Sequence, residues 1–281
     1  MTVLNNRIDF MFVISVEGAN PNGDPTASNI PREDSEGYGE ITDVCLKHKI
    51  RNYLHETGEE ILVLPTEITG ESLMSTLKNS GLNKLLNKGG MDQEKFKKEA
   101  CEKWFDVRTF GQVFGLKQTD TSSSVSTSIR GPMSIRAAYS IEPIVTREIN
   151  ITNVLNLEKQ DKRDNNTFGA RHIVEFGAYV SYGSIFPNLA EKTGFSVEDA
   201  EKIKQAILNM FLYDATSARP SGSMTLSELH WWTHDCASGR HAPAKVFHSY
   251  SFEASEKFPF YEIKQEYTLD RVKEEIYHYY D

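Results

Sequence analysis

The almost perfect alternation of apolar and polar residues in segment 7–17, RIDFMFVISVE, constrains the fold more than any other feature of the chain. The apolar set is Ile8, Phe10, Phe12, Ile14 and Val16, and the intervening polar set includes Arg7, Asp9, Ser15 and Glu17. Side chains of a β-strand point to opposite faces of a sheet in turn, so this period of two is typical of a strand. The segment therefore predicts a strand with one buried and one exposed face.

Two more long segments alternate in the same way. Residues 129–141 do so despite Pro132, which indicates an edge strand or a bulge, and residues 171–186 form the third segment. Shorter strand candidates are residues 61–64, 224–236 and 244–252.

Helical periodicity appears between these strands. Apolar residues at i, i+4, i+7 and i+8 predict a helix that Thr42 or Asp43 caps and Gly58 ends. A second amphipathic helix follows Ser196 and Asp199, whose spacing fits a capping box. Residues 269–279 are predicted to form a short C-terminal helix.

The order of the principal elements defines the expected fold class. It reads β-α-β-β-α-β, which predicts an α+β fold with a modified ferredoxin-like or RNA-recognition-motif sheet domain. We expect one domain, residues 1–281, with three additions: a helical lobe at 61–124, a polar hairpin or arm at 143–170, and an acidic C-terminal extension at 253–281.

Composition limits the class of protein. The 281 residues are 39% hydrophobic and 25% charged, which is ordinary for a globular protein, and no run is long enough to span a membrane. Three cysteines without C-x-x-C spacing fit a reduced, cytoplasmic setting. The net charge of −9 argues against nucleic acid as a partner, but the charge is segregated along the chain. Residues 44–55 carry three Lys/Arg and two His without an acid, whereas acids outnumber bases in 250–281.

Two segments are candidates for contact with a phosphate backbone. Lys47, Arg51 and His55 form a stripe at i, i+4 and i+8, although a solvated helix face would show the same pattern. The arm at 143–170 carries Lys159, Lys162 and Arg163, balanced by neighbouring acids, and a disordered surface loop is the alternative.

Two further groups could bind a metal ion. His230, His234 and Cys236, with His241 as a fourth ligand, suit zinc, but their spacing is unusual and packed histidines with a buried thiol fit equally. The first loop holds several carboxylates that a metal-dependent nuclease would need, although such acids also cap turns and helices. These are Glu17, Asp24, Glu33, Asp34 and Asp43.

A series of motifs in order resembles one known family. The loop GANPNGDPTASNIPR and the helix ITDVCLKHKIRNYL are followed by DVRTFGQVFG, IRGPMSIRAAYSIEPI, FGARHIVEFGAYVSYG, TGFSVEDAEKIKQAILNMF and SARPSGSM. Together they resemble the CRISPR-associated backbone subunit of the Cascade surveillance complex, and their spacing is most similar to the type I-C subgroup. The resemblance runs from about residue 7 to about residue 250.

The resemblance implies a function. Members of this family bind CRISPR RNA (crRNA) along its backbone, stack head-to-tail into a helical filament with a protruding thumb, and leave guide bases free to pair with target DNA. The partners implied are crRNA, target DNA, further copies of the chain, and the large, small and crRNA-processing end subunits of Cascade. No cofactor, membrane or catalysis is implied, although related type III subunits cut RNA with an aspartate of the first loop, here Asp24.

The matched motifs also imply which residues contact RNA. The acidic C-terminal region could meet a basic surface of a neighbouring copy, or keep the unassembled chain away from random RNA. The RNA-binding residues implied are Asn20, Asn22, Gly23, Lys47, Lys49, Arg51, Arg108, Arg130, Lys159, Lys162, Arg163, Arg171 and His172.

Overall fold

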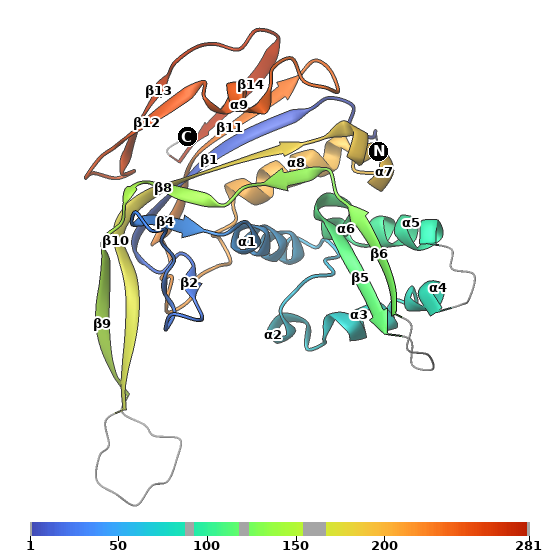
Figure 1. The fold of residues 1–281 in the computed structure, drawn as a ribbon, viewed down its shortest axis with the longest axis horizontal. Helices are drawn as coiled ribbons and strands as arrows, with labels where there is room; N and C mark the ends of the chain where they lie inside the picture. Colours follow the sequence, from blue (N-terminus) through green and yellow to red (C-terminus); the bar gives the residue numbers. More distant parts are fainter. Residues whose placement is uncertain (1, 88–92, 118–123, 154–166, 280–281) are drawn as a thin grey trace, which may run out of the picture.

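The computed structural model describes residues 2–87, 93–117, 124–153 and 167–279. Its centre is an eight-stranded sheet in which all paired strands are antiparallel (Figure 1). The main path across the sheet is β14-β11-β1-β10-β8-β4, and β7 and β9 also pair with β10. The strands are β1 (Ile8–Ala19), β4 (Tyr38–Ile41), β7 (Met133–Ile135), β8 (Ala138–Pro143), β9 (Thr146–Asn153), β10 (Thr167–Ile185), β11 (Met224–His234) and β14 (Val272–His278).

The predicted strand at 7–17 is confirmed, but both of its faces are buried rather than one. The even-numbered side chains from Ile8 to Val16 face a helical layer, and the odd-numbered Met11 and Val13 lie in a second apolar cluster on the opposite side. The alternation of apolar and polar residues indicates which side chains lie on the same face of the sheet. It does not report that Asp9 and Ser15 are also covered by distant parts of the chain.

One face of the sheet carries helices α1 (Asp43–Glu56) and α8 (Val197–Leu208), as Figure 1 shows. Both predicted helices are confirmed. The Thr42 side chain caps α1 by accepting from the backbone N–H of Cys45 at 3.2 Å, and Ser196 and Asp199 form the predicted capping box. Their apolar stripes pack on β1, β10 and β11 to form the largest core cluster. The short helix α7 (Pro187–Thr193) precedes α8.

The opposite face is covered by the C-terminal part of the chain. Helix α9 (Pro243–Phe247) and the hairpin of β12 (Tyr250–Ala254) and β13 (Tyr261–Gln265) pack over it (Figure 1). We call this segment, 243–269, the cap. The strand predicted at 244–252 is therefore half helix, and the acidic segment from 253 onward is built into the fold.

The helix predicted at 269–279 is wrong, because this segment forms the edge strand β14. Its neighbouring residues Glu274 and Glu275 bond to opposite sides of the sheet: Glu274 contacts His230 of β11, and Glu275 contacts Lys204 of α8. Only an extended backbone sends adjacent side chains in opposite directions. The two long-range partners therefore select the strand.

A separate lobe extends from the helical side and has its own apolar cluster. Its helices are α2 (Thr66–Thr69), α3 (Leu73–Asn79), α4 (Asn83–Asn87), α5 (Gln93–Lys103) and α6 (Phe105–Phe110), and its hairpin is β5 (Gly111–Lys117) with β6 (Ser124–Arg130). The strand predicted at 129–141 is interrupted at Gly131-Pro132, and its two parts belong to different sheets. Residues 61–64 are not a strand here.

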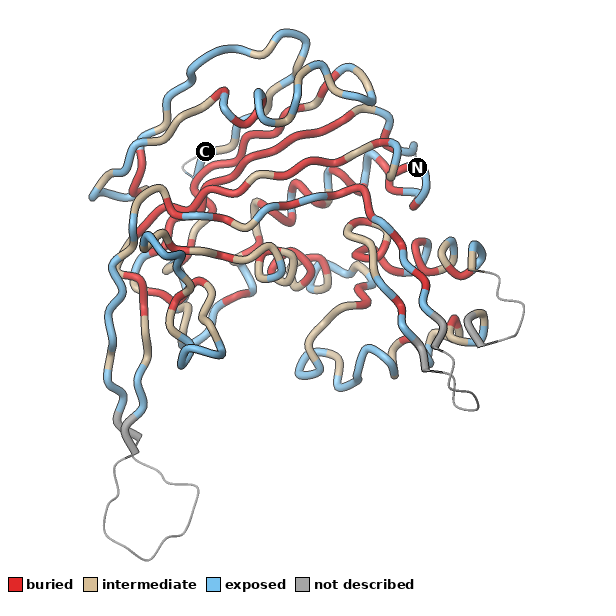
Figure 2. Tube along the Cα trace, in the orientation of Figure 1, coloured by how far each residue is buried: buried red, intermediate tan, exposed pale blue. Residues whose placement is uncertain are grey.

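The strand β10 is 19 residues long and serves two structures. Residues 174–185 pair with β1 inside the main sheet, whereas residues 167–174 pair with β9 in a hairpin that projects from the molecule (Figure 1). Burial ends where the hairpin leaves the sheet (Figure 2). The predicted arm at 143–170 corresponds to this hairpin, although 154–166 lie outside the described residues. In the described ranges, no helix is long and apolar enough to cross a membrane.

Candidate nucleic-acid interface

The sheet faces themselves are closed to a nucleic acid. RNA-recognition-motif proteins stack bases on exposed aromatic side chains of the sheet. Here Phe176, Tyr182 and Trp232 of the outer face pack against the cap instead, whereas Tyr139, near the sheet edge on β8, is 48% exposed. Phe176 stacks on Phe260 at 5.2 Å between ring centroids, Tyr182 lies 5.0 Å from Phe247, and Trp232 is fully buried. Contacts with nucleic acid therefore have to come from loops and hairpins.

Three segments meet at the base of the β9–β10 hairpin, and we call their meeting place the loop junction. It comprises the first loop (residues 20–32), a second loop (residues 214–223), and Arg171 of β10. The backbone N–H of Asn20 donates to the carbonyl of Ala218 at 2.9 Å, and the Arg171 guanidinium donates to the carbonyl of Ser217. The short strands β2 (Gly23–Asp24) and β3 (Ile30–Pro31) close the first loop on itself.

Three arginines give the loop junction its positive charge. Arg219 donates from Nε to Asp214 at 2.9 Å, and Arg32 lies 3.4 Å from Asp24. The Nε atoms of Arg32 and Arg171 are buried and have no hydrogen-bond partner in the described part of the chain. A guanidinium presents five donors in a fixed plane, which suits a phosphate group. The junction therefore holds more cationic donors than its own carboxylates use.

The predicted residues of the first loop shape the junction from inside. Asn20 is buried and donates from Nδ2 to the carbonyl of Asn29 at 2.7 Å. The Oδ1 atom of Asn22 accepts from the backbone and side chain of Thr42, which fixes the loop to the start of α1. A Cβ atom on Gly23 would lie 2.9 Å from the backbone carbonyl oxygen of Asn29, so the close approach of the two backbones favours glycine. These contacts give Asn20, Asn22 and Gly23 structural roles within the loop.

Of the three cations of α1 that the resemblance implies contact RNA, namely Lys47, Lys49 and Arg51, the structure buries two, Lys49 and Arg51. Lys49 is only 1% exposed and its ammonium pairs with Asp214. Burial lowers the pKa of Lys49, and burial together with the charge of Lys49 lowers the pKa of His48. Only Lys47 keeps a partly exposed ammonium, which pairs with Asp43 at 2.8 Å.

Arg51 belongs to the connection between the sheet domain and the lobe. Its Nε donates to Asp106 Oδ2 at 2.9 Å, and its guanidinium lies 4.9 Å from the ring centre of Phe110. Asp106 is fully buried and also accepts from the backbone N–H groups of Leu62 and Val63. The charge of Arg51 thus neutralises a carboxylate that organises the first residues of the lobe.

The remaining predicted residues lie in different places. Arg108 makes a bidentate pair with Asp199 at 2.9 and 3.1 Å, joining α6 to α8. His172 lies on the hairpin beside Arg171, where it faces Glu148 across the strands. Arg130 is exposed at the end of β6, in the lobe and outside the loop junction. The predicted Lys159, Lys162 and Arg163 lie outside the described residues.

Sequence reasoning missed Arg32 and Arg219. Both stand in the quoted motifs, Arg32 at the end of GANPNGDPTASNIPR and Arg219 within SARPSGSM. The signal was an arginine beside proline in two loops far apart in the chain. Only the fold shows that the two loops meet.

The histidines considered as zinc ligands are engaged with carboxylates. His230 contacts Glu274 from Nδ1 at 2.8 Å and Glu228 from Nε2 at 2.6 Å. His234 contacts Asp9 at 2.8 Å from Nε2, and its Nδ1 accepts from the backbone of Arg240. Within the described ranges, no three His, Cys, Asp or Glu side chains are placed to hold a metal ion.

The carboxylates of the first loop hold local structure. Asp24 accepts from the backbone and hydroxyl of Thr26 at 2.9 and 2.7 Å, and these hydrogen bonds lower its pKa. Asp34 accepts from the backbone N–H groups of Glu36 and Tyr38. Such contacts are typical of turns built around aspartate.

The family model for CRISPR-associated protein Cas7 matches residues 6–271, so the chain belongs to the Cas7 family. A curated CRISPR-associated protein Cas7 from Haloferax volcanii is 28% identical over 220 residues, which cover 72% of this chain and 63% of that protein. The alignment thus leaves more than a third of that relative's length unmatched.

Two solved structures are similar at low sequence identity. One is a chain of a "CRISPR RNA-guided surveillance complex, pre-nicking", with a TM-score of 0.49, 13% identity, and coverage of 80% of this chain and 78% of that one. The other is a chain of a "CRISPR RNA-guided surveillance complex", with a TM-score of 0.49, 12% identity, and coverage of 90% and 77%.

Proposed function

We propose that this protein is the crRNA-binding backbone subunit of a CRISPR surveillance complex, with no catalytic step of its own. Membership of the Cas7 family supports this role, and the titles of the two similar structures name RNA-guided surveillance complexes. The observation that carries the proposal is the loop junction, where Arg32, Arg171 and Arg219 collect at the base of a projecting hairpin.

The loop junction suits a nucleic-acid backbone more than base edges. Its donors are guanidinium groups and the Nδ2 amide of Asn22, which has no hydrogen-bond partner among the described residues, and such groups bind phosphate and ribose without reading sequence. The cap covers Phe176, Tyr182 and Trp232, which could otherwise stack on bases, so bases are left for pairing with another strand. His172 and Lys47 lie on the elements that enclose the junction and complete the proposed contact set. Lys49, Arg51 and Arg108 are excluded from it because their charges are paired inside the protein.

The finer features of the proposal follow from the motifs and the strand order. The order of β1, α1, β8, β10, α8 and β11 supports a modified RNA-recognition-motif palm, with the β9–β10 hairpin as its thumb. We propose a type I-C Cascade, head-to-tail copies along crRNA, and neighbouring large, small and crRNA-processing subunits in the cytoplasm. Target DNA would be bound through the guide.

The test is the RNA affinity of a double variant, Arg171→Ala with Arg219→Ala. We expect weaker binding to every single-stranded RNA tried, and a salt dependence reduced by about 0.7 per lost phosphate contact. Arg240→Ala is the matched control, because Arg240 is exposed and lies beyond the other end of β11. An equal effect of both changes, or an unchanged salt slope in the folded double variant, would remove the loop junction from the interface.

The alternative is a metal-dependent ribonuclease centred on Asp24. Both of its carboxylate oxygens already have partners, Thr26 for one and Arg32 for the other, which favours a structural role in the loop. We expect Asp24→Ala to weaken RNA binding modestly through a looser loop. Complementary RNA incubated with the complex and magnesium or manganese provides the measurement. Regularly spaced products that disappear in Asp24→Ala would favour the nuclease.

A further inference from the structure

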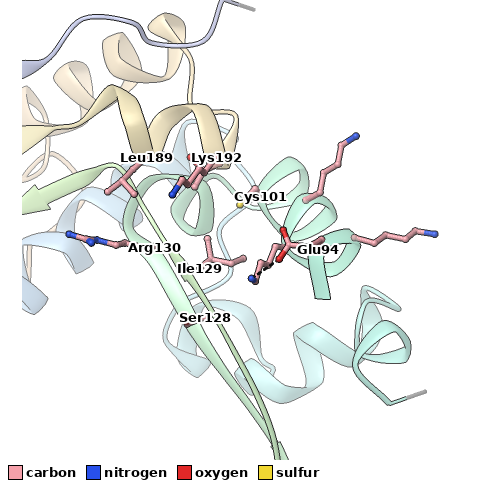
Figure 3. Close-up of a pocket in the computed structure, with 11 residues that line it drawn as sticks. Glu94, Cys101, Ser128, Ile129, Arg130, Leu189 and Lys192 are labelled. Atoms are coloured by element: carbon pink, nitrogen blue, oxygen red, sulfur yellow. Dashed lines mark hydrogen bonds and ion pairs between the residues drawn. The ribbon is translucent and has the colours of Figure 1, made fainter. Parts of the chain in front are cut away.

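A basic groove lies between the lobe and the sheet domain, away from the loop junction. Its volume is about 770 Å³, and its walls come from α5, β6 and α7 (Figure 3). Arg130 and Lys192 line it, both are exposed, and neither has an ion-pair partner among the residues that the structure describes. The lysines of α5 add positive charge, which Glu94, Glu99 and Glu102 partly offset.

An acidic patch of opposite character lies on the cap hairpin. Glu253 of β12 and Glu262 of β13 stand directly opposite each other, and both are exposed. Their neighbours Phe252 and Ile263 point to the sheet, which leaves the two carboxylates on the outer surface. Neither carboxylate has an ion-pair partner in the described ranges. Like charges at directly opposed positions destabilise a hairpin, so a cation placed there would relieve the repulsion.

The groove and the patch lie toward opposite ends of the molecule. In Figure 1 the β12–β13 hairpin is at the left, whereas α5, β6 and α7 are at the right along the longest axis. They therefore cannot neutralise each other within one chain. Two different, complementary surfaces at opposite ends generate heterologous contacts, which repeat from copy to copy as an open filament.

We propose that the acidic patch of one copy docks into the basic groove of the next. This inference rests on the proposed function, because it assigns the surfaces through which successive backbone copies meet. Glu253 and Glu262 pair with Arg130 and Lys192 of the neighbour. Electrostatic complementarity of this kind sets register and suppresses wrong contacts. It also assigns a use to the acidic C-terminal region of a chain whose net charge is −9.

Charge reversal tests the pairing on an RNA long enough for several copies. The groove variant is Arg130→Glu with Lys192→Glu, and the patch variant is Glu253→Lys with Glu262→Lys. We expect each to need about tenfold more protein than the wild type to form multi-copy particles, measured by sedimentation and electron microscopy. The protein with all four changes should assemble again at the wild-type concentration, because every contact is then reversed on both sides.

Mixing the groove variant with the patch variant distinguishes the loss of this specific contact from a general loss of the ability to assemble. Neither two-site variant should assemble alone. In a mixture, both the acidic patch and the reversed groove of the groove variant meet basic surfaces of the patch variant, so the two variants should assemble together in alternation. The control is Lys78→Glu with Lys84→Glu, two exposed lobe lysines outside the groove, and it should assemble normally. Thermal unfolding checks that every variant is folded.

Three outcomes would overturn the proposal. The first is wild-type assembly by either folded two-site variant. The second is a mixture of the folded variants that forms no multi-copy particles. The third is loss of double-stranded DNA binding with undisturbed assembly in the groove variant, which would make the groove a nucleic-acid site. Binding of a short RNA by Glu253→Gln with Glu262→Gln tests the proposed function separately, and we expect it to equal that of the wild type.

Discussion

The two faces of the central sheet are held in different ways. The face toward α1 and α8 is almost entirely apolar, with Phe12, Ile14 and Leu229 fully buried against helical side chains such as Leu46 and Ile207. The face toward the cap mixes aromatic side chains with ionised groups, among them Asp9, Glu228 and His230, all at most 3% exposed.

The charged groups of the cap face form two networks. Asp9 accepts from Arg7, Ser184 and His234, and these contacts outweigh the effect of burial and lower its pKa. His230 lies between Glu228 and Glu274. Burial alone would lower the pKa of His230, but its bonds to the two carboxylates raise it. Glu228 also accepts from Tyr261 of the cap.

This difference teaches what each covering layer requires. The stability that apolar packing provides depends on the shape and volume of the side chains and not on pH. A small change in side-chain volume on the helical face therefore costs little, and the cost is the same at every pH. A buried ionic network depends on every partner, because an unpaired charge in the interior is strongly unfavourable. We therefore expect substitutions on the cap face to have larger and more pH-dependent effects than substitutions on the helical face.

The largest effect should follow Asp9→Ala, which leaves the buried guanidinium of Arg7 without its carboxylate. We expect the free energy of unfolding to fall by about 3–5 kcal/mol. Urea unfolding of the purified protein measures it. Asp9→Asn, which preserves shape and removes the charge, should recover only part of the loss. A loss below that of a conservative apolar change would contradict the asymmetry between the faces.

The next effect concerns His230→Gln and should depend on pH. The pKa of His230 is raised above its ordinary 6.5, so the ion pairs contribute fully below pH 6.5 and are lost as pH rises through the folded value. Glu228 has a lowered pKa, so the same contacts are also lost on acidification below 4.5. We expect a loss of about 1–3 kcal/mol near pH 6 that shrinks toward pH 9, measured by urea unfolding across that range. A constant difference would argue against a charged His230.

A smaller and pH-independent effect should follow Ile14→Val on the helical face. One buried methylene is removed, and we expect a loss of about 0.5–1.5 kcal/mol. The same urea titrations provide the measurement, with the His230→Gln series as the comparison. A pH-dependent loss at Ile14 would show that the helical face is coupled to the ionic networks.

The smallest effect should follow Lys273→Ala on the edge strand β14. Lys273 is exposed, and its Nζ lies 2.9 Å from Oε1 of Glu275. In the variant, Glu275 would still pair with the buried Lys204 through its other carboxylate oxygen. Exposed pairs of this kind contribute about 0.2–1 kcal/mol, and added salt screens them. We expect a change at the lower end of that range at low salt, and none in 1 M salt. A larger loss would mean that the edge strand depends on its surface charges.

Local sequence patterns identified a good part of the fold. Alternation located β1 and β10, helical periodicity with caps located α1 and α8, and the serine-to-aspartate spacing predicted the capping box at Ser196. These features succeed because they depend on neighbours within a few residues. The helix prediction for 269–279 was wrong because this segment becomes a strand only through its contacts with β11 and α8, which are distant in the chain.

The sequence predicted less of the candidate site than of the fold. The first loop and Arg171 were identified from motifs, whereas the partners of Lys49, Arg51 and Arg108 were not. Those partners are Asp214, Asp106 and Asp199, which lie 165, 55 and 91 residues away. A basic stripe on a helix looks the same in sequence whether its charges meet solvent or buried carboxylates.

The sequence by itself determined the long strands β1 and β10, the two main helices and the family, because periodicity, capping and ordered motifs depend on residues that are close together in the chain. The tertiary structure decided which charged side chains are paired inside the protein and which remain exposed to solvent. Arg51 and Lys47 differ by one helical turn, yet one pairs with a fully buried carboxylate and the other stays partly exposed. The physical reason is that desolvation and pairing depend on what packs against a side chain, and distant segments supply that contact.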